Sequence, residues 1–353
     1  MRKLDRYIVK TLAGAMLLVL VVVLSLDLLF GYIAELDETK ADYQALEALL
    51  FMLYTIPRRI HDYLPLAAFM GALIGMGTLA NTSELVVMRA AGVSLRRLVW
   101  SAMKPALVLV LVGALLGEYV APYFERIAQS DKAVARGAAE NIADVHGFWH
   151  REGRTFMHFN AVQPNGVLHG VTLFKFGEDR WLEKAAFAKR GIYQGDHWLL
   201  QDVEQTVLSI DHTERKTFKS LRWDTEISPQ VLGVLIIKPE NLSISGLYTY
   251  AHYLSEQDLN ANLYWMAFWK KVLQPLATAV LVLVAISFVF GPLRSVTMGF
   301  RVFTGIIVGL LFKYMQDLLG PMSLVFGFDP ILATLGPIAV CAVVGAVLLK
   351  RAG

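Results

Sequence analysis

The sequence predicts an α-helical membrane protein with six transmembrane helices and an all-β, jelly-roll-like domain on the far side of the membrane. Of the 353 residues, 56% are hydrophobic with Gly left out, which exceeds the roughly 45–50% of ordinary soluble domains with Gly counted. Residues 123–266 hold 33 of the 63 charged residues. Apolar stretches long enough to cross a bilayer lie only on either side of this block. The composition excludes a wholly soluble protein.

The apolar stretches predict three spans, a polar insert and three further spans. Each has roughly the 17–25 residues that cross a bilayer core. They lie near residues 11–34, 62–80, 99–120, 268–290, 302–319 and 330–349. We therefore expect three parts: residues 1–122, which include a short cytoplasmic helix near 81–92, residues 123–266, and residues 267–353.

The basic residues predict the orientation of these spans. The first span follows four basic residues, as the apolar core of a signal peptide does. Its apolar stretch is longer than such a core, however, and no clear cleavage site follows. We therefore interpret the first span as a retained membrane anchor. With both termini in the cytoplasm, twelve Lys and Arg fall on the cytoplasmic side and only Lys40, Arg58 and Arg59 fall in short loops on the other side. This asymmetry places the insert on the far side of the membrane. The twelve are Arg2, Lys3, Arg6, Lys10, Arg89, Arg96, Arg97, Lys104, Arg294, Arg301, Lys350 and Arg351.

The insert has the alternation of β-strands. Segments 155–159 and 172–176 alternate with period two, and Asn165-Gly166 and Gly195-Asp196 are turn signals. Several short strands at close spacing favour a sandwich or jelly roll. An amphipathic helix is expected to begin at Ser243 or Ser245, with a serine oxygen accepting from its first amides, and to lead back to the fourth span.

A short helix is predicted between the second and third spans. The segment 81–84 (Asn-Thr-Ser-Glu) can cap a helix reciprocally, residues 85–91 continue it, and Gly92 ends it before Ser94 opens the next helix. Such a helix is too short to cross a membrane. We expect it to lie across the cytoplasmic end, where its apolar side needs cover from lipid or another protein.

Several function classes are excluded by missing motifs. The charge balance of 33 basic and 30 acidic residues, without a basic run, disfavours nucleic acid as a partner. No Gly-Lys pair occurs, so the chain lacks a phosphate-binding loop. Metalloprotease and serine-hydrolase motifs are also missing, and the eight histidines lack metal-ligand spacing. We expect no catalytic residue, no metal site, and no disulfide from the single Cys341.

Charged residues inside spans need a partner or a function, because each costs about 2.5–3.5 kcal/mol at a helix centre. They are Asp27, Glu118, Lys270, Lys271, Lys313 and Asp317. Lys313 and Asp317 are four residues apart, which predicts a mutual ion pair. The alternative is that Lys313, Lys270 or Lys271 binds an anionic head group, although Lys270 and Lys271 could equally extend to the interface. Arg58 and Arg59, between aromatic residues, fit either interfacial anchors or substrate contacts.

Sequence motifs spread over most of the chain resemble one family, the lipopolysaccharide-export permeases, and within it the G-type subunits. No single motif is decisive, but their order and topology together are specific. The motifs are residues 4–8 (LDRYI), 83–92 (SELVVMRAAG), 117–122 (GEYVAP), 242–247 (LSISGL), 274–276 (QPL), 287–295 (SFVFGPLRS) and 320–321 (GP).

The resemblance implies a permease that extracts lipopolysaccharide from the inner membrane and passes it toward the outer membrane. It implies pairing with an F-type permease (LptF), two copies of the cytoplasmic ATPase LptB, and the single-span protein LptC. This chain would bind no cofactor, since ATP and Mg²⁺ are used by the ATPase. It also implies that the segment 81–92 is a coupling helix held in a groove of the ATPase. The expected contacts are Glu84, Leu85, Val87, Met88 and Arg89.

The lipid contacts are less defined by the resemblance. Family members can carry a phosphate-binding lysine late in span one, whereas this chain has Phe30 there, with Asp27 just before it. Lys132 matches a basic position of the family and is the first candidate for contact with the lipid phosphates. The other candidates for lipid contact are Arg136, Arg58, Arg59, Lys270, Lys271 and Phe30 itself. The candidates for an apolar groove in the insert are Phe156, Phe174 and Trp198.

Two other classes of function remain open from the residues alone. A secondary transporter would fit the intramembrane charges, but not the large β insert or the lack of paired discontinuous helices. Dependence on an ion gradient would identify it. A structural envelope anchor would use the insert only to dock other proteins, and co-purification of an ATPase would count against it.

Overall fold

The computed structural model describes residues 2–39, 42–135, 148–162, 166–209, 212–225, 227, 232, 238–256, 260–290 and 296–352. The chain divides into two compact units. The helical unit comprises residues 1–29, 57–121 and 243–353, and the sheet unit comprises residues 30–56 and 122–242. The sheet unit therefore includes the adjoining ends of the first two long helices as well as the strands.

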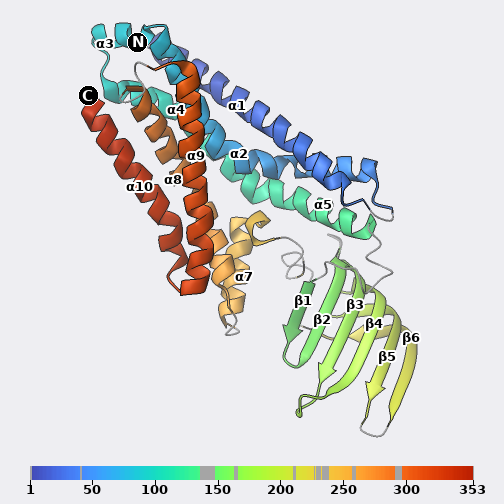
Figure 1. Cartoon of the computed structure of the whole chain (residues 1–353). Coiled ribbons are helices and arrows are strands. Elements are labelled where there is room, and N and C mark those ends of the chain that lie inside the picture. The colour runs from blue at the N-terminus through green and yellow to red at the C-terminus, as the bar shows by residue number, and fades with distance from the viewer. Residues whose placement is uncertain are drawn as a thin grey trace. The chain divides into compact units, whose positions relative to one another are not determined.

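The predicted six spans are confirmed, because six helices are long and apolar enough to cross a membrane. In Figure 1 both chain termini and the short helix α3 (Glu84–Ala90) lie at one end of the helical unit. The spans are α1 (Arg2–Leu36), α2 (Ala45–Asn81), the continuous run α4 (Leu95–Leu115), η1 (Leu116–Val120) and α5 (Ala121–Ala135), then α8 (Asn262–Phe290), α9 (Met298–Phe326) and α10 (Pro330–Ala352). The shorter elements between the sheet and α8 are η3 (Pro239–Asn241) and α7 (Ile244–Glu256).

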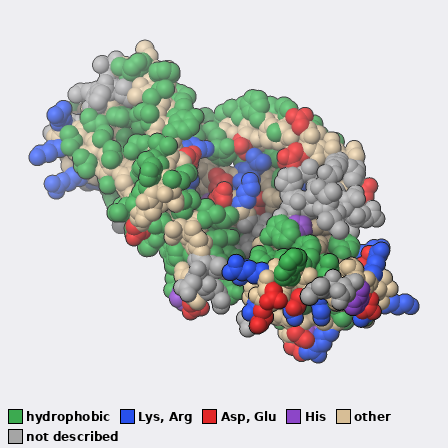
Figure 2. All heavy atoms as spheres, turned by 60° about the horizontal axis from the view of Figure 1, so that its bottom comes forward, with side chains coloured by type: hydrophobic (Ala, Val, Ile, Leu, Met, Phe, Trp, Pro, Cys, Tyr) green, Lys and Arg blue, Asp and Glu red, His purple; other side chains and the backbone are tan. Residues whose placement is uncertain are grey.

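The helical unit is held together by apolar packing and by close backbone contacts at glycines. Leu12 and Met16 of α1 and Leu73 and Met76 of α2 belong to one buried cluster. A Cβ atom added at Gly71 would lie 2.4 Å from the Met16 Cα, so only glycine permits this approach of α2 to α1. Outside this core the helices expose many large apolar side chains, and Figure 2 shows hydrophobic side chains over much of their visible surface. Such a surface suits lipid or a protein partner.

The third span contains a π-helical turn, η1, where a side chain from α2 packs against it. The ring of His61 lies against Gly117, where an added Cβ would be 2.5 Å from the His61 Cε1. The His61 Nδ1 lies 2.8 Å from the Gly113 carbonyl oxygen. Side-chain contact with the backbone ladder is a common cause of such local irregularity.

The intramembrane carboxylate Glu118 has a structural partner, the N-terminus of α7. Its oxygens accept hydrogen bonds from the amides of Ile244 (2.8 Å) and Ser245 (3.3 Å) and from the Ser245 hydroxyl (2.5 Å). A negative charge is stabilising at the positive end of a helix. The Ser243 Oγ accepts from the Gly246 amide at 3.1 Å, which confirms the predicted serine cap at Ser243.

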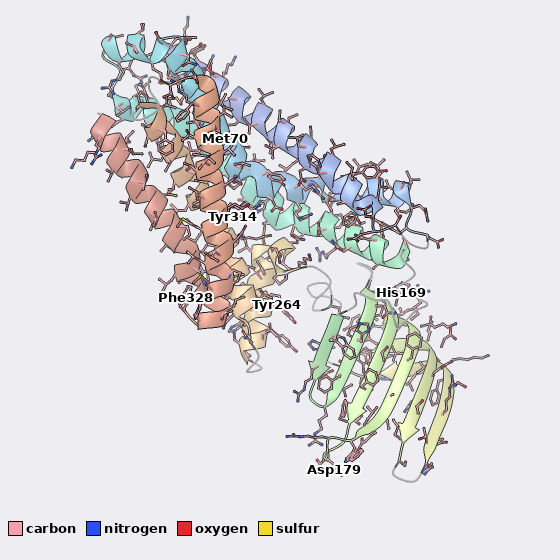
Figure 3. The ribbon with its side chains drawn as sticks, viewed as in Figure 1. Met70, His169, Asp179, Tyr264, Tyr314 and Phe328 are labelled. Atoms are coloured by element: carbon pink, nitrogen blue, oxygen red, sulfur yellow. The ribbon has the colours of Figure 1, made fainter. Side chains whose placement is uncertain are left out.

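The sheet unit contains the predicted β domain. Its strands form one six-stranded antiparallel sheet in the order β1-β2-β3-β4-β5-β6. Among the described residues the domain is therefore a meander of sequential strands, without the second sheet of a jelly roll. The strands are β1 (Phe148–Glu152), β2 (Thr155–Val162), β3 (Val167–Phe176), β4 (Leu182–Tyr193), β5 (Trp198–Leu208) and β6 (Thr213–Trp223). In Figure 3 His169 lies near the start of β3 and Asp179 at the turn beyond its end.

The alternation of side chains between the two faces of the sheet is interrupted within β3 and β5. Gly170 and Asp202 have positive φ values of 60° and 51°, which interrupt the ordinary alternation. As a result, Leu168 and Val171, three residues apart, both enter the same buried cluster. A Cβ at Gly170 would lie 2.2 Å from the Asn160 Nδ2, so this position needs glycine for both its conformation and its space.

The three predicted groove residues do not share a face of the sheet. Phe156 pairs directly with Phe174, and the next pair, Met157 with Leu173, points to the opposite face. Met157 belongs to the buried cluster, as does the fully buried Trp198, whose Nε1 donates to the Ile227 carbonyl at 2.8 Å. Phe156 and Phe174 therefore lie on the face opposite the core, where Phe174 stacks on Trp149 with ring centroids 6.0 Å apart.

The sheet unit is expected to lose stability in mild acid. Burial lowers the pKa values of His150, His158 and His169 below their ordinary value of 6.5. The unfolded chain therefore binds protons more readily than the folded sheet, so stability is complete above pH 6.5 and falls as the pH drops toward the lowered native values. Hydrogen exchange of peptides from β1 to β3 in the full chain, corrected for intrinsic rates, should show this loss. A pH dependence that survives the combined replacement of His150, His158 and His169 by Gln would contradict it.

Candidate functional site

The candidate partner site is the exposed side of α3. Two of its residues, Leu85 and Met88, are only 4% and 7% exposed because they pack into the core of the helical unit. Val86 and Val87 are 51% and 65% exposed, and Arg89 also lies on the surface. An exposed valine pair on a two-turn helix is an apolar contact surface without cover from this chain.

The structure thus divides the five predicted coupling residues. Val87 and Arg89 are available to a partner and Glu84 is half-buried, whereas Leu85 and Met88 attach the helix to the bundle. Sequence reasoning missed Val86. Helical spacing could have found it, because with buried positions at 85 and 88 the residues 86 and 87 must point elsewhere.

The ends of α3 differ in part from the prediction. Gly92, with a φ of 83°, ends the helix as expected. The predicted reciprocal cap is wrong, because Ser83 adopts a left-handed conformation with a φ of 60° and makes no side-chain cap. The Glu84 carboxylate instead accepts from the Thr82 hydroxyl at 2.9 Å. Glu84 is half-buried and also hydrogen-bonds to Tyr7 of α1, so a cationic partner would meet a carboxylate that already has two partners within this chain.

The first lipid candidate, Lys132, lies in a cage of acidic and aromatic side chains. Its Nζ forms ion pairs with Glu35 and with Glu38, the latter at 2.8 Å, and lies 4.7 Å from the centroid of the Phe51 ring. The Lys132 side chain is only 14% exposed. Two carboxylates already neutralise this lysine, so a phosphate would have to displace at least one of them. The other candidate in this region, Arg136, lies outside the described residues.

Arg59 and Asp27 form an ion pair between α2 and α1. The Tyr63 hydroxyl also donates to the Asp27 Oδ1 at 2.6 Å. Arg58 instead pairs with Asp62 at 3.5 Å on its own helix. Asp27 is thus paired as an intramembrane charge should be, and Arg59 has a structural partner. Phe30, one helical turn after Asp27 on α1, is 65% exposed.

The predicted ion pair between Lys313 and Asp317 is wrong. Asp317 pairs with Lys270 of α8, at 3.2 Å, and so connects α9 to α8. Lys313 is exposed and makes no ion pair with any described residue. Lys271, the neighbour of Lys270, lines a cavity of about 180 Å³ inside the helical unit together with His61 and Gln274. The two adjacent lysines of α8 therefore have different surroundings.

Comparison with known proteins places these features in one family. The family described as lipopolysaccharide export system permease LptF/LptG matches residues 6–351. The chain belongs to the LptF/LptG family. The lipopolysaccharide export system permease protein LptG of Escherichia coli K12 is 36% identical over 353 residues, which cover 99% of this chain and 98% of the relative. LptG of Haemophilus influenzae is 34% identical over 337 residues, covering 95% and 94%. These matches confirm the resemblance to the G-type subunits.

Membership of the LptF/LptG family fits the chemistry of the chain. The described residues contain no group of three or more His, Cys, Asp or Glu side chains that could hold a metal ion. Several of the candidate residues are instead exposed, as Val87 and Arg89 are, or ion-paired, as Lys132 and Arg59 are. Sequence reasoning missed the acidic partners of Lys132. The spacing of Glu35 and Glu38, one turn apart at the end of α1, was the available signal.

Proposed function

We propose that this chain is a permease subunit of an ATP-driven transporter that extracts lipopolysaccharide from the inner membrane and passes it toward the outer membrane. The observation that carries the proposal is the family match over residues 6–351, since it includes all six candidate spans and the sheet. A shared function is therefore supported for the whole chain and not for an isolated domain. The chain itself catalyses no reaction.

The energetics require a partner that supplies work. Each CH₂ group of an acyl chain gains about 0.8 kcal/mol from burial, so a lipid with several chains is held in the bilayer by many tens of kcal/mol. The permease offers apolar helix faces along which such chains can move. The partner is a cytoplasmic ATPase of the LptB type, which binds the exposed side of α3 and uses ATP and Mg²⁺. An F-type permease and an LptC-type single-span protein complete the assembly.

The route of the lipid follows from the expected orientation, with both termini in the cytoplasm and the sheet in the periplasm. We propose that the lipid phosphates meet basic residues of each unit along the route: Lys132 and Arg136 of the sheet unit, and Arg58, Arg59, Lys270 and Lys271 of the helical unit. For Lys132 and Arg59 the phosphate replaces a carboxylate partner, which makes the contact reversible. The acyl chains then follow an apolar side of the sheet, either that of Trp198 or that of Phe156 and Phe174.

The test is reconstitution of the chain with an F-type permease and the ATPase in vesicles that contain lipopolysaccharide. We expect release of the glycolipid to a soluble acceptor only when ATP is present. Photo-crosslinkers at Lys132, Phe156 and Trp198 should capture lipid in an ATP-dependent order. Release driven by an ion gradient would instead support a secondary transporter. A lack of any nucleotide-dependent release would overturn the proposal and favour a structural anchor.

A further inference from the structure

Two polar contacts flank α3 along the chain. Before α3, the Arg301 Nη1 of α9 donates to the Gly77 carbonyl and to the Asn81 Oδ1, both at 2.7 Å, in the last turn of α2. We call this contact the Arg301 clamp. After α3, the Asp5 carboxylate of α1 accepts from the Arg97 Nε (3.2 Å) and Nη2 (2.9 Å) near the start of α4. We call this contact the Asp5 clamp.

Both clamps have geometries that resist displacement. Arg301 is 1% exposed, and its cation lies at the C-terminal end of α2, where the helix dipole is negative. Movement of the guanidinium away from these oxygens would leave a buried charge with fewer hydrogen bonds, which is costly. In the Asp5 clamp two N–H groups meet two carboxylate oxygens, and the Ser101 hydroxyl adds a third hydrogen bond at 3.1 Å. Such bidentate pairs fix orientation as well as distance.

The two clamps join the ends of α2 and α4 to α9 and α1, which are the two least buried spans. In the most apolar window of α1, and equally of α9, only 11% of the residues are buried within the chain, compared with 67% for α2 and 50% for α8. Most of α1 and α9 therefore faces lipid or another subunit. Close contact of α9 with α2 continues beyond the clamp, since a Cβ added at Gly305 would lie 2.8 Å from the sulfur of Met70, which is labelled in Figure 3.

We propose that Asp5 and Arg301 are positioning residues that transmit a displacement of α3 to α1 and α9. The proposal rests on the proposed function, in which an ATPase moves α3. Only Thr82 and Ser83 separate α2 from α3, and only residues 91–94 separate α3 from α4, so movement of α3 must act on both clamped helix ends. Each clamp then passes that movement to one of the spans whose exposed side faces the lipid or a partner. Energetic coupling of this kind is carried by rigid helices joined through hydrogen bonds. The two clamps provide these joints between α2 and α9 and between α4 and α1.

The first experiment measures lipid released per ATP hydrolysed in the reconstituted transporter. Arg301→Gln and Asp5→Asn should each lower this ratio about tenfold, within the range of typical coupling effects, while ATPase binding stays within about twofold of the parent. Arg301→Lys, which keeps the charge, should recover part of the ratio, as should the swap Asp5→Arg with Arg97→Asp. The exposed neighbour Arg96→Gln is the matched control and should leave the ratio unchanged. An unchanged ratio in both Arg301→Gln and Asp5→Asn would overturn the proposal.

The second experiment needs no ATPase. In a Cys341→Ser background, spin labels at Val87→Cys of α3 and Phe303→Cys of α9 report the distance between these helices. We expect a narrow distance distribution that broadens with Arg301→Gln, or with Asn81→Ala if the arginine variant fails to fold. If the distance distribution stays narrow in the folded variant, then the Arg301 clamp does not hold α3 and α9 in position, whether or not the ATPase binds. Failure of the parent chain to bind any ATPase would instead contradict the proposed function, and the distance result would still decide the clamp.

Discussion

Val87→Asp and Glu84→Arg are expected to abolish co-purification of the ATPase without unfolding the permease. Val87 is 65% exposed on α3, so an aspartate there costs the free chain little. In the complex the same carboxylate would be buried in an apolar contact. The binding free energy lost at such a position is typically about 2 kcal/mol or more, which weakens binding at least about thirtyfold. Glu84→Arg reverses the charge at the first turn of α3. The measurement is the amount of ATPase retained on the tagged permease at increasing salt.

The buried side of the same helix offers the matched comparison. Leu85→Ala should lower the thermal unfolding midpoint of the chain, because removal of a buried leucine side chain costs about 2–5 kcal/mol. Val87→Asp should leave that midpoint within a degree or two. If Leu85→Ala lost the ATPase while the midpoint stayed constant, and Val87→Asp retained it, then the partner would bind the other side of α3.

Arg59→Gln and Asp27→Asn are each expected to destabilise the helical unit strongly. The two side chains are 13% and 23% exposed and pair between α2 and α1. Removal of one member of this half-buried pair leaves the other charge poorly compensated inside a span, at a cost of about 2.5–3.5 kcal/mol. The double variant should lose less than the sum of the single losses, since neither charge then remains. Reversible unfolding in mixed micelles, followed by tryptophan fluorescence, gives the free energies.

Arg58→Gln is the control for this ion pair. Arg58 and Asp62 lie 3.5 Å apart on one helix and are 25% and 47% exposed, so their pair is worth about 1 kcal/mol or less. Equal losses for Arg58→Gln and Arg59→Gln would mean that the pair with Asp27 has no special role. Additive losses in the Asp27→Asn and Arg59→Gln double variant would lead to the same conclusion.

The spans and the α7 cap were predictable because local rules decide them. A run of apolar residues such as 330–349 can satisfy its backbone in lipid only as a helix, whatever its neighbours are. Ser243 reaches an amide of its own helix, so its role also depends on nearby residues alone. The faces of the sheet were harder to predict. At Gly170 and Asp202 the alternation of side chains between the two faces of the sheet is interrupted. A simple period-two pattern ignores this interruption and therefore places Trp198 on the same face as Phe156, which is wrong.

The order of residues along the chain was enough to identify a six-span permease of the LptF/LptG family with an inserted β domain and a short helix that turns an apolar side outward. The pairing of the charges became visible only in the folded chain. Asp317 meets Lys270 rather than Lys313, Lys132 meets two carboxylates, and Arg301 reaches the end of α2. The physical reason is that an ion pair depends on distances of a few ångströms between helices that are far apart in the chain. Spacing along one helix specifies only the helix face on which a charged side chain lies, and not the partner that it meets.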